Sequence, residues 1–265
     1  MAKDFEYDGR LLSSFGMIIC SFDSKGMDTV SNGSQITFNT ISSLGGTRHQ
    51  LISTQYEDCL ETTIQICKYS CTSDIQEISS HELRELTRWL NRKKFLKFKI
   101  LDEDYIDLYF EASFNISRIE FNGKVYGLEL EVTTNRPFAI KEPRTIVIKN
   151  LVKEGKHSVH DTSHEEGYIY PHTQIEIIED GDLDIYNALE DRNVVVKNCK
   201  AGEIITMDYP VITTTDESHK LNIQNDFNWN FFRIANTYRN SSNDFTISIP
   251  CTIKFAYSPV VKVGL

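Results

Sequence analysis

The chain has 265 residues and a formal net charge of -10, because 38 aspartates and glutamates outnumber 28 lysines and arginines. This length suffices for one large β domain or two domains of ordinary size. Its 40% hydrophobic content, with 15 Phe and 12 Tyr, excludes a disordered chain, and its acidic balance argues against a surface that follows nucleic-acid phosphates. The start of the chain lacks a secretory signal pattern and no run approaches the roughly 20 apolar residues of a membrane span, so we expect synthesis in the cytoplasm and no membrane partner.

The six cysteines lie mostly inside strand-like patterns, which is typical of reduced, buried thiols and not of a disulfide framework. Cys67 and Cys71 have a spacing seen in half of a zinc site, but no second pair follows at a suitable distance. We therefore predict structural thiols, no metal and no cofactor.

The N-terminal half alternates apolar and polar residues with the period of two that defines β-strands, at 15–22, 34–38 and 60–67. Between the last two segments, residues 42–49 contain paired glycines and small polar residues, which predict a turn or an exposed hairpin tip. Such a tip could reach a neighbouring molecule.

One helix is predicted to begin after Ser79, because Ser79 and Glu82 have the spacing of a capping box. Its apolar face carries Leu83, Leu86, Trp89 and Leu90. The opposite face is basic and is either a solvated surface or a contact between subunits; the candidates for that contact are Arg84, Arg88, Arg92 and Lys93.

Two hairpins follow, one over 95–110 around the acidic turn 102–104 and one over 113–132 around Asn122-Gly123. Because strand edges pair readily with other chains, both hairpins are candidates for subunit contact. Two nearby prolines, Pro137 and Pro143, then mark a domain boundary, which divides the chain into 1–138 and 139–265. Seven or more short strands in the second half predict a jelly-roll β-sandwich, so the fold class is mainly β with one helix.

Enzymatic chemistry has weak support in this sequence. His157, His160, His164 and His172 form the only His cluster, but their segment is polar and reads as an exposed loop, with an adventitious metal site as the alternative. The carboxylates at 102–104 and at Asp180 and Asp182 are typical of turns. Since nucleophile and phosphate-binding motifs are also absent, we predict that the protein is not an enzyme.

Aromatic side chains of the second half could stack on a sugar ring or contact a partner protein. The candidates are Trp229, Tyr168, Tyr170 and Phe227, beside Tyr209 and Tyr238. A sandwich core uses the same residue types, and this is their commoner role. Asn228 and Asn230, which flank Trp229, could either end a strand or donate hydrogen bonds to a sugar.

Three segments together resemble a known family. They are the opening 5–9 followed by 15–23, the capped helix that ends in Trp89-Leu90 with Phe95-Leu96 beyond it, and 130–139; the stretches 225–234 and 257–265 add a second-domain likeness. Nearly the whole chain is similar in this way to the distal tail proteins of long-tailed siphophages, although each motif is a loose pattern of apolar and turn residues.

The resemblance implies a fold and a function. The first domain would be a β-sandwich or split barrel that closes into a homohexameric ring, either single or paired with a second ring, in the phage tail tip of the virion. DNA and the tape-measure protein would pass through the ring, whose faces would meet the tail-tube protein and the tail-associated spike or lysin. The galectin-like second domain would contact a receptor-binding protein or, as an alternative function, act as an adhesin for cell-wall sugar.

Overall fold

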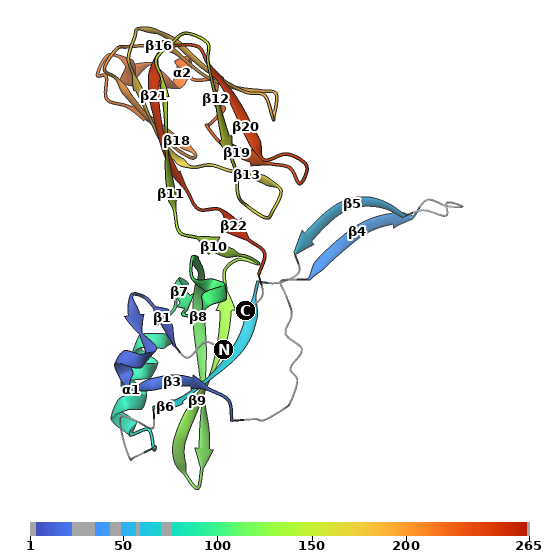
Figure 1. The fold of residues 1–265 in the computed structure, drawn as a ribbon, viewed down its shortest axis with the longest axis vertical. Helices are drawn as coiled ribbons and strands as arrows, with labels where there is room; N and C mark the ends of the chain where they lie inside the picture. The colour runs from blue at the N-terminus through green and yellow to red at the C-terminus, as the bar shows by residue number, and fades with distance from the viewer. Residues whose placement is uncertain (1–3, 23–34, 43–48, 57–58, 70–75, 264–265) are drawn as a thin grey trace. The chain divides into compact units, whose positions relative to one another are not determined.

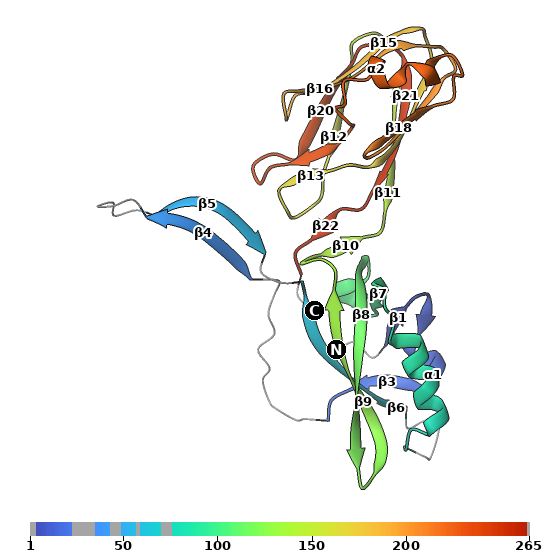
Figure 2. The same cartoon turned by 180° about the vertical axis from the view of Figure 1, so that it is seen from behind.

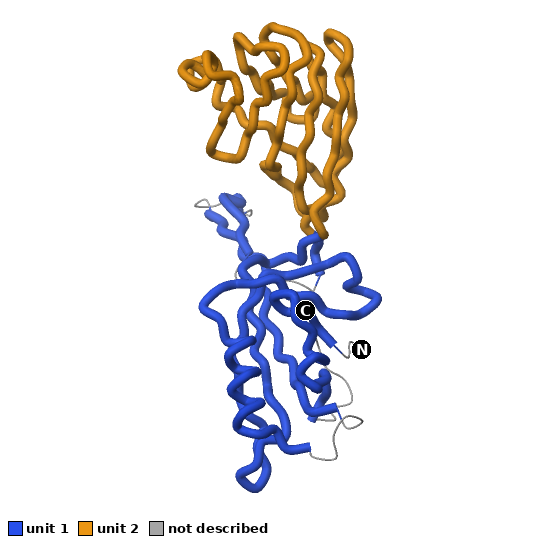
Figure 3. The backbone as a smooth tube through the Cα atoms, turned by 90° about the vertical axis from the view of Figure 1, so that its left-hand side faces the viewer, with its two compact units in different colours: residues 1–141, 261–265 blue, residues 142–260 orange. Residues whose placement is uncertain are grey.

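The computed structural model describes residues 4–22, 35–42, 49–56, 59–69 and 76–263. The chain divides into two compact units, shown in different colours in Figure 3: unit 1 comprises residues 1–141 and 261–265, and unit 2 comprises residues 142–260. The boundary between the units, after residue 141, therefore lies three residues beyond the boundary predicted after residue 138. The predicted second domain also extended to Leu265, whereas Val261 lies in the hydrophobic core of unit 1.

Unit 1 is built on one antiparallel sheet (Figure 1). Its strands run in the order β2-β1-β7-β8-β9-β6-β3, and β10 pairs with both β8 and β22. The bounds are β1 (Phe5–Tyr7), β2 (Arg10–Leu11), β3 (Met17–Cys20), β6 (Glu61–Lys68), β7 (Leu96–Ile100), β8 (Leu108–Phe121), β9 (Lys124–Thr134), β10 (Ala139–Lys141) and β22 (Val260–Val261). Short 3-10 helices, η1 (Leu12–Phe15) and η2 (Glu103–Tyr105), join some of them.

Helix α1 (Ser80–Leu90) begins where the capping box predicts. The Ser79 backbone N–H donates to Glu82 Oε2 at 2.7 Å, and the Glu82 N–H donates to Ser79 Oγ at 3.3 Å. Lys68 Nζ also lies 2.9 Å from Glu82 Oε1. Although partial burial opposes the charge, these bonds from Ser79 and Lys68 lower the pKa of Glu82.

No helix in the described ranges is long and apolar enough to cross a membrane.

Trp89 attaches α1 to the sheet. Its ring is buried, stacks on Phe15 with centroids 4.4 Å apart and on Phe5 at 5.8 Å, and its Nε1–H donates to the Tyr7 carbonyl oxygen at 3.0 Å. The single polar atom of the indole therefore has a hydrogen-bond acceptor inside an aromatic core that includes Phe114.

Strand β8 differs from the prediction. The segments 105–110 and 113–121 were expected in separate hairpins, but one 14-residue strand covers the last three residues of the first segment and all of the second, because the alternation of buried and partly buried side chains continues through Glu111 and Ala112. The turn prediction at Asn122-Gly123 is confirmed: φ is 50° and 75° at these residues, and Phe121 pairs with Lys124.

Strands β4 (Ile36–Ser42) and β5 (His49–Tyr56) pair only with each other and form a separate hairpin. The predicted strand at 34–38 therefore continues to Ser42, and its partner strand was not predicted. Most of the tip predicted at 42–49 lies outside the described residues.

Unit 2 is a sandwich of two antiparallel sheets, seen from behind in Figure 2. The five-stranded sheet has the order β11 (Arg144–Asn150), β21 (Cys251–Tyr257), β14 (His172–Ile177), β17 (Ile204–Asp208), β18 (Val211–Thr214). The four-stranded sheet has the order β12 (Gly155–His160), β20 (Ser242–Ile247), β15 (Gly181–Asn187), β16 (Arg192–Cys199). A pair, β13 (Gly167–Ile169) with β19 (Ile234–Asn236), and two short helices, η3 (His219–Leu221) and α2 (Ile223–Asp226), complete the unit.

The two inner faces of unit 2 meet in one hydrophobic core, to which Leu183, Val196, Ile253 and Phe255 contribute fully buried side chains. The predicted mainly-β architecture is therefore confirmed. The predicted exposed loop around the His cluster is partly wrong, because His157 and His160 lie within β12, hydrogen-bonded to β20.

The described cysteines are free thiols. Burial raises the pKa of Cys199 and of Cys251 to about 12, and burial together with a hydrogen bond to Cys67 does the same for Cys20. These three side chains are therefore neutral, poor nucleophiles at physiological pH. Cys71 lies outside the described residues.

The capping box makes a first prediction. Substitution Ser79→Ala should lower the free energy of unfolding of unit 1 by about 1 kcal/mol, because the Glu82 N–H loses its acceptor. Denaturant titration followed by circular dichroism measures the change, and Ser80→Ala, one residue inside the helix, is the matched control. The lowered pKa of Glu82 means that its contribution is present at neutral pH and is lost as the pH falls through that pKa. An equal effect of both substitutions would contradict the assignment.

Candidate functional site

Unit 2 contains a continuous row of six aromatic rings. Adjacent centroids are 5.4 Å apart for Tyr168–Tyr170, 4.3 Å for Tyr170–Tyr209, 5.3 Å for Tyr209–Phe231, 5.0 Å for Phe231–Phe227 and 5.8 Å for Phe227–Trp229. The middle rings, Phe227 and Phe231, belong to the hydrophobic core, whereas Tyr168, Tyr209 and Trp229 are each more than half exposed. The row therefore joins the core of the sandwich to its surface.

Five of the six aromatic residues named as candidates from the sequence belong to this row, which we call the aromatic row: Trp229, Tyr168, Tyr170, Phe227 and Tyr209. Phe227 is a core residue, as the commoner role of aromatics predicts. Sequence reasoning did not select Phe231, which connects the two ends of the row, because nothing in the sequence places residue 231 beside residue 209. Tyr238 lies outside the row, and its hydroxyl is 3.4 Å from Glu165 Oε2.

Arg233 holds the tyrosine end of the row. Its guanidinium lies 4.0 Å from the centre of the Tyr168 ring, and its Nη1 donates to the Tyr170 hydroxyl at 3.3 Å. Two of its nitrogens also pair with Glu190, Nε at 3.1 Å and Nη2 at 2.5 Å. Burial opposes the charge, but the bonds to Glu190 and Tyr170 raise the pKa of Arg233. A permanent cation thus fixes one face of Tyr168 and leaves the rest of that ring exposed.

The turn at Trp229 is held by its asparagine neighbours. Asn228 Oδ1 accepts from the backbone N–H of Val195 at 3.2 Å and of Asn230 at 3.1 Å. The side-chain Nδ2 groups of Asn228 and Asn230 both donate to the Asn193 carbonyl oxygen, at 3.1 and 2.9 Å. These bonds attach the turn to β16 and keep Trp229 at φ 61°, with its ring at the surface. The asparagines therefore act as turn residues.

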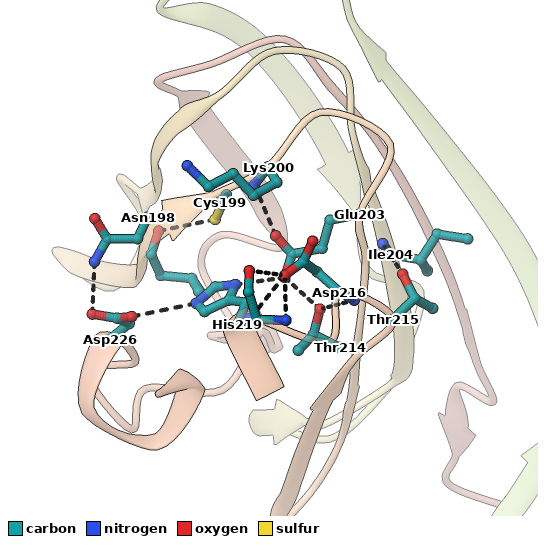
Figure 4. A network of polar contacts seen from close by, with 12 residues as sticks. Asn198, Cys199, Lys200, Glu203, Ile204, Thr214, Thr215, Asp216, His219 and Asp226 are labelled. Atoms are coloured by element: carbon teal, nitrogen blue, oxygen red, sulfur yellow. Dashed lines mark hydrogen bonds and ion pairs between the residues drawn. The ribbon is translucent and has the colours of Figure 1, made fainter. Parts of the chain in front are cut away.

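A buried polar network supports residues 216–226, the segment that precedes Phe227 of the aromatic row (Figure 4). His219 Nδ1 lies 2.6 Å from Glu203 Oε1, and His219 Nε2 lies 3.5 Å from Asp226 Oδ2. Glu203 also accepts from the Thr214 hydroxyl and from the Lys200 N–H at 2.8 Å. The Glu203 side chain is fully buried, so these partners replace the water that a free carboxylate would bind.

This network connects the end of β18 to η3 and α2. Asp216 accepts from the backbone N–H groups of Ser218 and His219 at 2.9 and 2.8 Å, and Asp226 accepts from Asn198 Nδ2 at 2.9 Å. Phe227 follows Asp226 directly, so the network positions the start of the aromatic row. The sequence contained no signal for it, since Glu203 and His219 stand 16 residues apart in unremarkable contexts.

The remaining candidates for ligand chemistry do not converge. His157 Nε2 is 3.2 Å from Asn150 Oδ1, while His172 begins a strand of the other sheet. Among the residues that the structure describes, no group of three or more His, Cys, Asp or Glu is arranged to hold a metal ion. Asp180 accepts from the Ala201 N–H at 2.7 Å, and Asp182, which lies in β15, accepts from the Asn198 N–H at 2.9 Å, so both carboxylates join distant parts of the backbone.

In unit 1, a groove of about 690 Å³ lies between α1 and the tip of the β8–β9 hairpin. Arg84 and Arg88 of the predicted basic face line it, together with Arg118 and Lys124 from the hairpin. Arg92 and Lys93 follow the end of α1 and do not belong to this lining. Only two of the four residues of the predicted basic face therefore line the groove, and two further cations come from the hairpin.

Comparison with known proteins defines the class. A family model described as a phage tail protein N-terminal domain matches residues 1–136, and one described as a phage tail C-terminal domain matches residues 138–257. The chain therefore belongs to this family of two-domain phage tail proteins, and it is a component of a virion tail. No curated protein sequence matches it significantly.

The structure is similar to a crystal structure of the Dit protein (gp 19.1) of SPP1, which is described as a paradigm of the hub adsorption apparatus in phages that infect Gram-positive bacteria. The TM-score is 0.63 at 13% sequence identity, over 97% of this chain and 99% of the SPP1 protein. The resemblance to distal tail proteins that the sequence indicated is confirmed at the level of family and fold.

The buried network makes the second prediction. Substitution His219→Leu should lower the free energy of unfolding of unit 2 by about 3–5 kcal/mol, because the Glu203 carboxylate stays buried without its main partner. Replacing both residues, Glu203→Leu with His219→Leu, should recover much of that loss, since no unpaired charge remains. The matched control is His172→Leu, whose half-exposed contact with Asp208 at 3.9 Å contributes less than about 1 kcal/mol. A double substitution as damaging as the sum of both singles would refute this role.

Proposed function

We propose that the protein is the distal tail, or hub, component of a long non-contractile phage tail, and that its copies join through unit 1 into a hexameric ring. The observation that carries this proposal is the β4–β5 hairpin, whose large apolar side chains are exposed. Family membership and the Dit-like fold support the tail-tip assignment. The ring would join the tail-tube protein to the spike or lysin and leave a channel for DNA and the tape-measure protein.

One face of the hairpin carries Ile36, Phe38, Leu51 and Tyr56, together with Thr40, Thr54 and the polar pair Ser42 and His49. Ile36 pairs with Tyr56, Phe38 with Thr54 and Thr40 with Leu51, and paired side chains lie on the same face of a two-stranded sheet. The opposite face carries Thr37, Asn39, Ile41, Gln50, Ser53 and Gln55.

Near its base the hairpin contacts unit 1 through Tyr56, whose ring is 5.0 Å from that of Phe138. Further out, Phe38 is 62% exposed, Leu51 58% and Ile52 60%. An isolated two-stranded hairpin is at best marginally stable in water. Because about two-fifths of each side chain is already buried, covering the rest would stabilise the hairpin by roughly 1–2 kcal/mol per side chain.

A second copy of the same chain suits this surface. An arm that covers a different part of the next copy forms a head-to-tail interface, and such interfaces close into rings when the rotation permits. The hairpins predicted for subunit contact are weaker candidates, since β7 and β9 have neighbours on both sides over much of their length. Beyond Ala112, however, β8 pairs with β9 alone in the described sheet.

The third prediction tests the apolar face. Substitution Phe38→Ser should reduce assembly of the full chain, whereas Ile41→Ser on the opposite face should have little effect, although Ile41 is 58% exposed. Light scattering across a concentration series gives the mass, and negative-stain imaging of the largest species shows whether a channel is present. Equal losses for both variants, or a wild-type assembly without a channel, would contradict the proposal.

The aromatic row supports a second candidate function, the binding of a cell-wall carbohydrate by unit 2. Exposed tyrosine and tryptophan rings offer apolar faces on which sugar C–H groups can stack, with polar atoms at their edges. Tyr209 and Trp229 lie on either side of the buried Phe231–Phe227 pair, so both are held on the core of the sandwich. A receptor-binding protein could use the same surface.

The fourth prediction uses the two tryptophans as reporters. Trp89 is 2% exposed and Trp229 is 56% exposed, so a soluble ligand that contacts the row should change the emission of Trp229 alone. Titration with purified host cell-wall polysaccharide should shift the fluorescence of the wild type. Trp229→Phe should remove the shift and Tyr209→Ala should weaken it, while Tyr238→Ala, outside the row, should leave it intact. A shift that survives Trp229→Phe would place the binding elsewhere.

A further inference from the structure

Among the residues that the structure describes, the lining of the groove between α1 and the β8–β9 tip has four cations, Arg84, Arg88, Arg118 and Lys124, against the two acids Glu77 and Glu120. Lys124 Nζ pairs with Glu77 at 2.7 Å, and Arg118 Nη1 lies 3.7 Å from Glu120. Arg84 and Arg88 have no carboxylate within ion-pair distance in the described chain. The groove also includes the apolar side chains Ile78, Leu83 and Val125. In a chain with a net charge of -10, this surface is suited to an acidic segment with apolar residues beside it.

Unit 1 itself carries a segment of that chemistry. The turn between β7 and β8 contains Asp102, Glu103 and Asp104, and the side chain of Asp102 accepts from the Asp104 N–H at 3.4 Å, which shapes the turn. On either side of the acids, Leu101 is 44% and Ile106 76% exposed. We call residues 101–106 the acidic turn.

The groove and the acidic turn lie at opposite ends of β8. The acidic turn precedes Leu108, whereas Arg118 and Glu120 of the groove are near the end of the strand at Phe121. A 14-residue strand spans roughly 40 Å. The two surfaces therefore cannot meet within one copy, but two different surfaces on opposite ends of a domain are what a head-to-tail contact requires.

We propose that the acidic turn of one copy docks into the groove of the next, with Glu103 and Asp104 opposite Arg84 and Arg88. Leu101 or Ile106 then covers the apolar part of the groove around Leu83. This contact rests on the proposed ring and names a specific pair of surfaces for it, separate from the β4–β5 hairpin. The charge pairs fix the register of neighbouring copies and exclude a contact of groove with groove, because like charges repel.

Charge reversal tests the contact in the full chain. Arg84→Glu with Arg88→Glu should raise the concentration for half-assembly by roughly tenfold or more, and Glu103→Lys with Asp104→Lys should do the same. One chain that carries all four reversals should assemble like the wild type. An equimolar mixture of the two double variants should also assemble, since each then supplies the complement of the other around an even-numbered ring. The matched control is Arg92→Glu with Lys93→Glu, which leaves the groove unchanged.

Sedimentation velocity distinguishes the outcomes. Restored assembly in the four-fold variant or in the mixture supports the contact, because two damaged folds would not restore each other. If the wild type assembles and both double variants assemble equally well, the proposed contact is wrong, but the proposed ring is not contradicted. Loss of assembly without rescue shows that the groove binds something other than the acidic turn, and also overturns it. A wild type that stays monomeric throughout the series counts against the contact and the ring together.

Discussion

The packing of Trp89 against the first strands of the chain determines the layout of unit 1. Its ring stacks on Phe15 and Phe5 and its N–H reaches the Tyr7 carbonyl, so rotation of α1 about its own axis would break an aromatic contact and a buried hydrogen bond together. Once this face is fixed, Arg84 and Arg88 must face away from the core. The cationic groove is therefore a consequence of how the helix is attached, and the capping box sets where the helix begins.

In unit 2, core packing and a buried polar network support the candidate site. The aromatic row has its middle rings in the hydrophobic core, so its exposed ends are held by core packing. The segment before Phe227 contributes Ile223 to the same core, and the buried contacts of Glu203, His219 and Asp226 also hold it in place. A buried carboxylate is costly without partners, so the network favours a single arrangement of this segment.

The two units therefore present surfaces of different chemistry. Unit 1 exposes an apolar hairpin and two surfaces of opposite charge, the cationic groove and the acidic turn. Unit 2 exposes aromatic rings ordered by Arg233 and by two asparagines, which suit contact with another molecule. This division agrees with the proposal that unit 1 joins the copies and that unit 2 binds another molecule.

The sequence by itself determined the features that depend on neighbours along the chain. The alternation of strands, the Ser79 cap and the Asn122-Gly123 turn follow from local backbone geometry, so all three were predictable. Even there, the length of β8 was missed, because alternation alone does not say whether a break at Glu111 and Ala112 occurs. The tertiary structure alone decided which distant residues meet, such as Phe231 with Tyr209 and His219 with Glu203, and which line one groove, such as Arg84 and Lys124. Such arrangements depend on the order of the strands in each sheet. That order is set by the burial of complete sheet faces, and the local alternation of apolar and polar residues does not encode it.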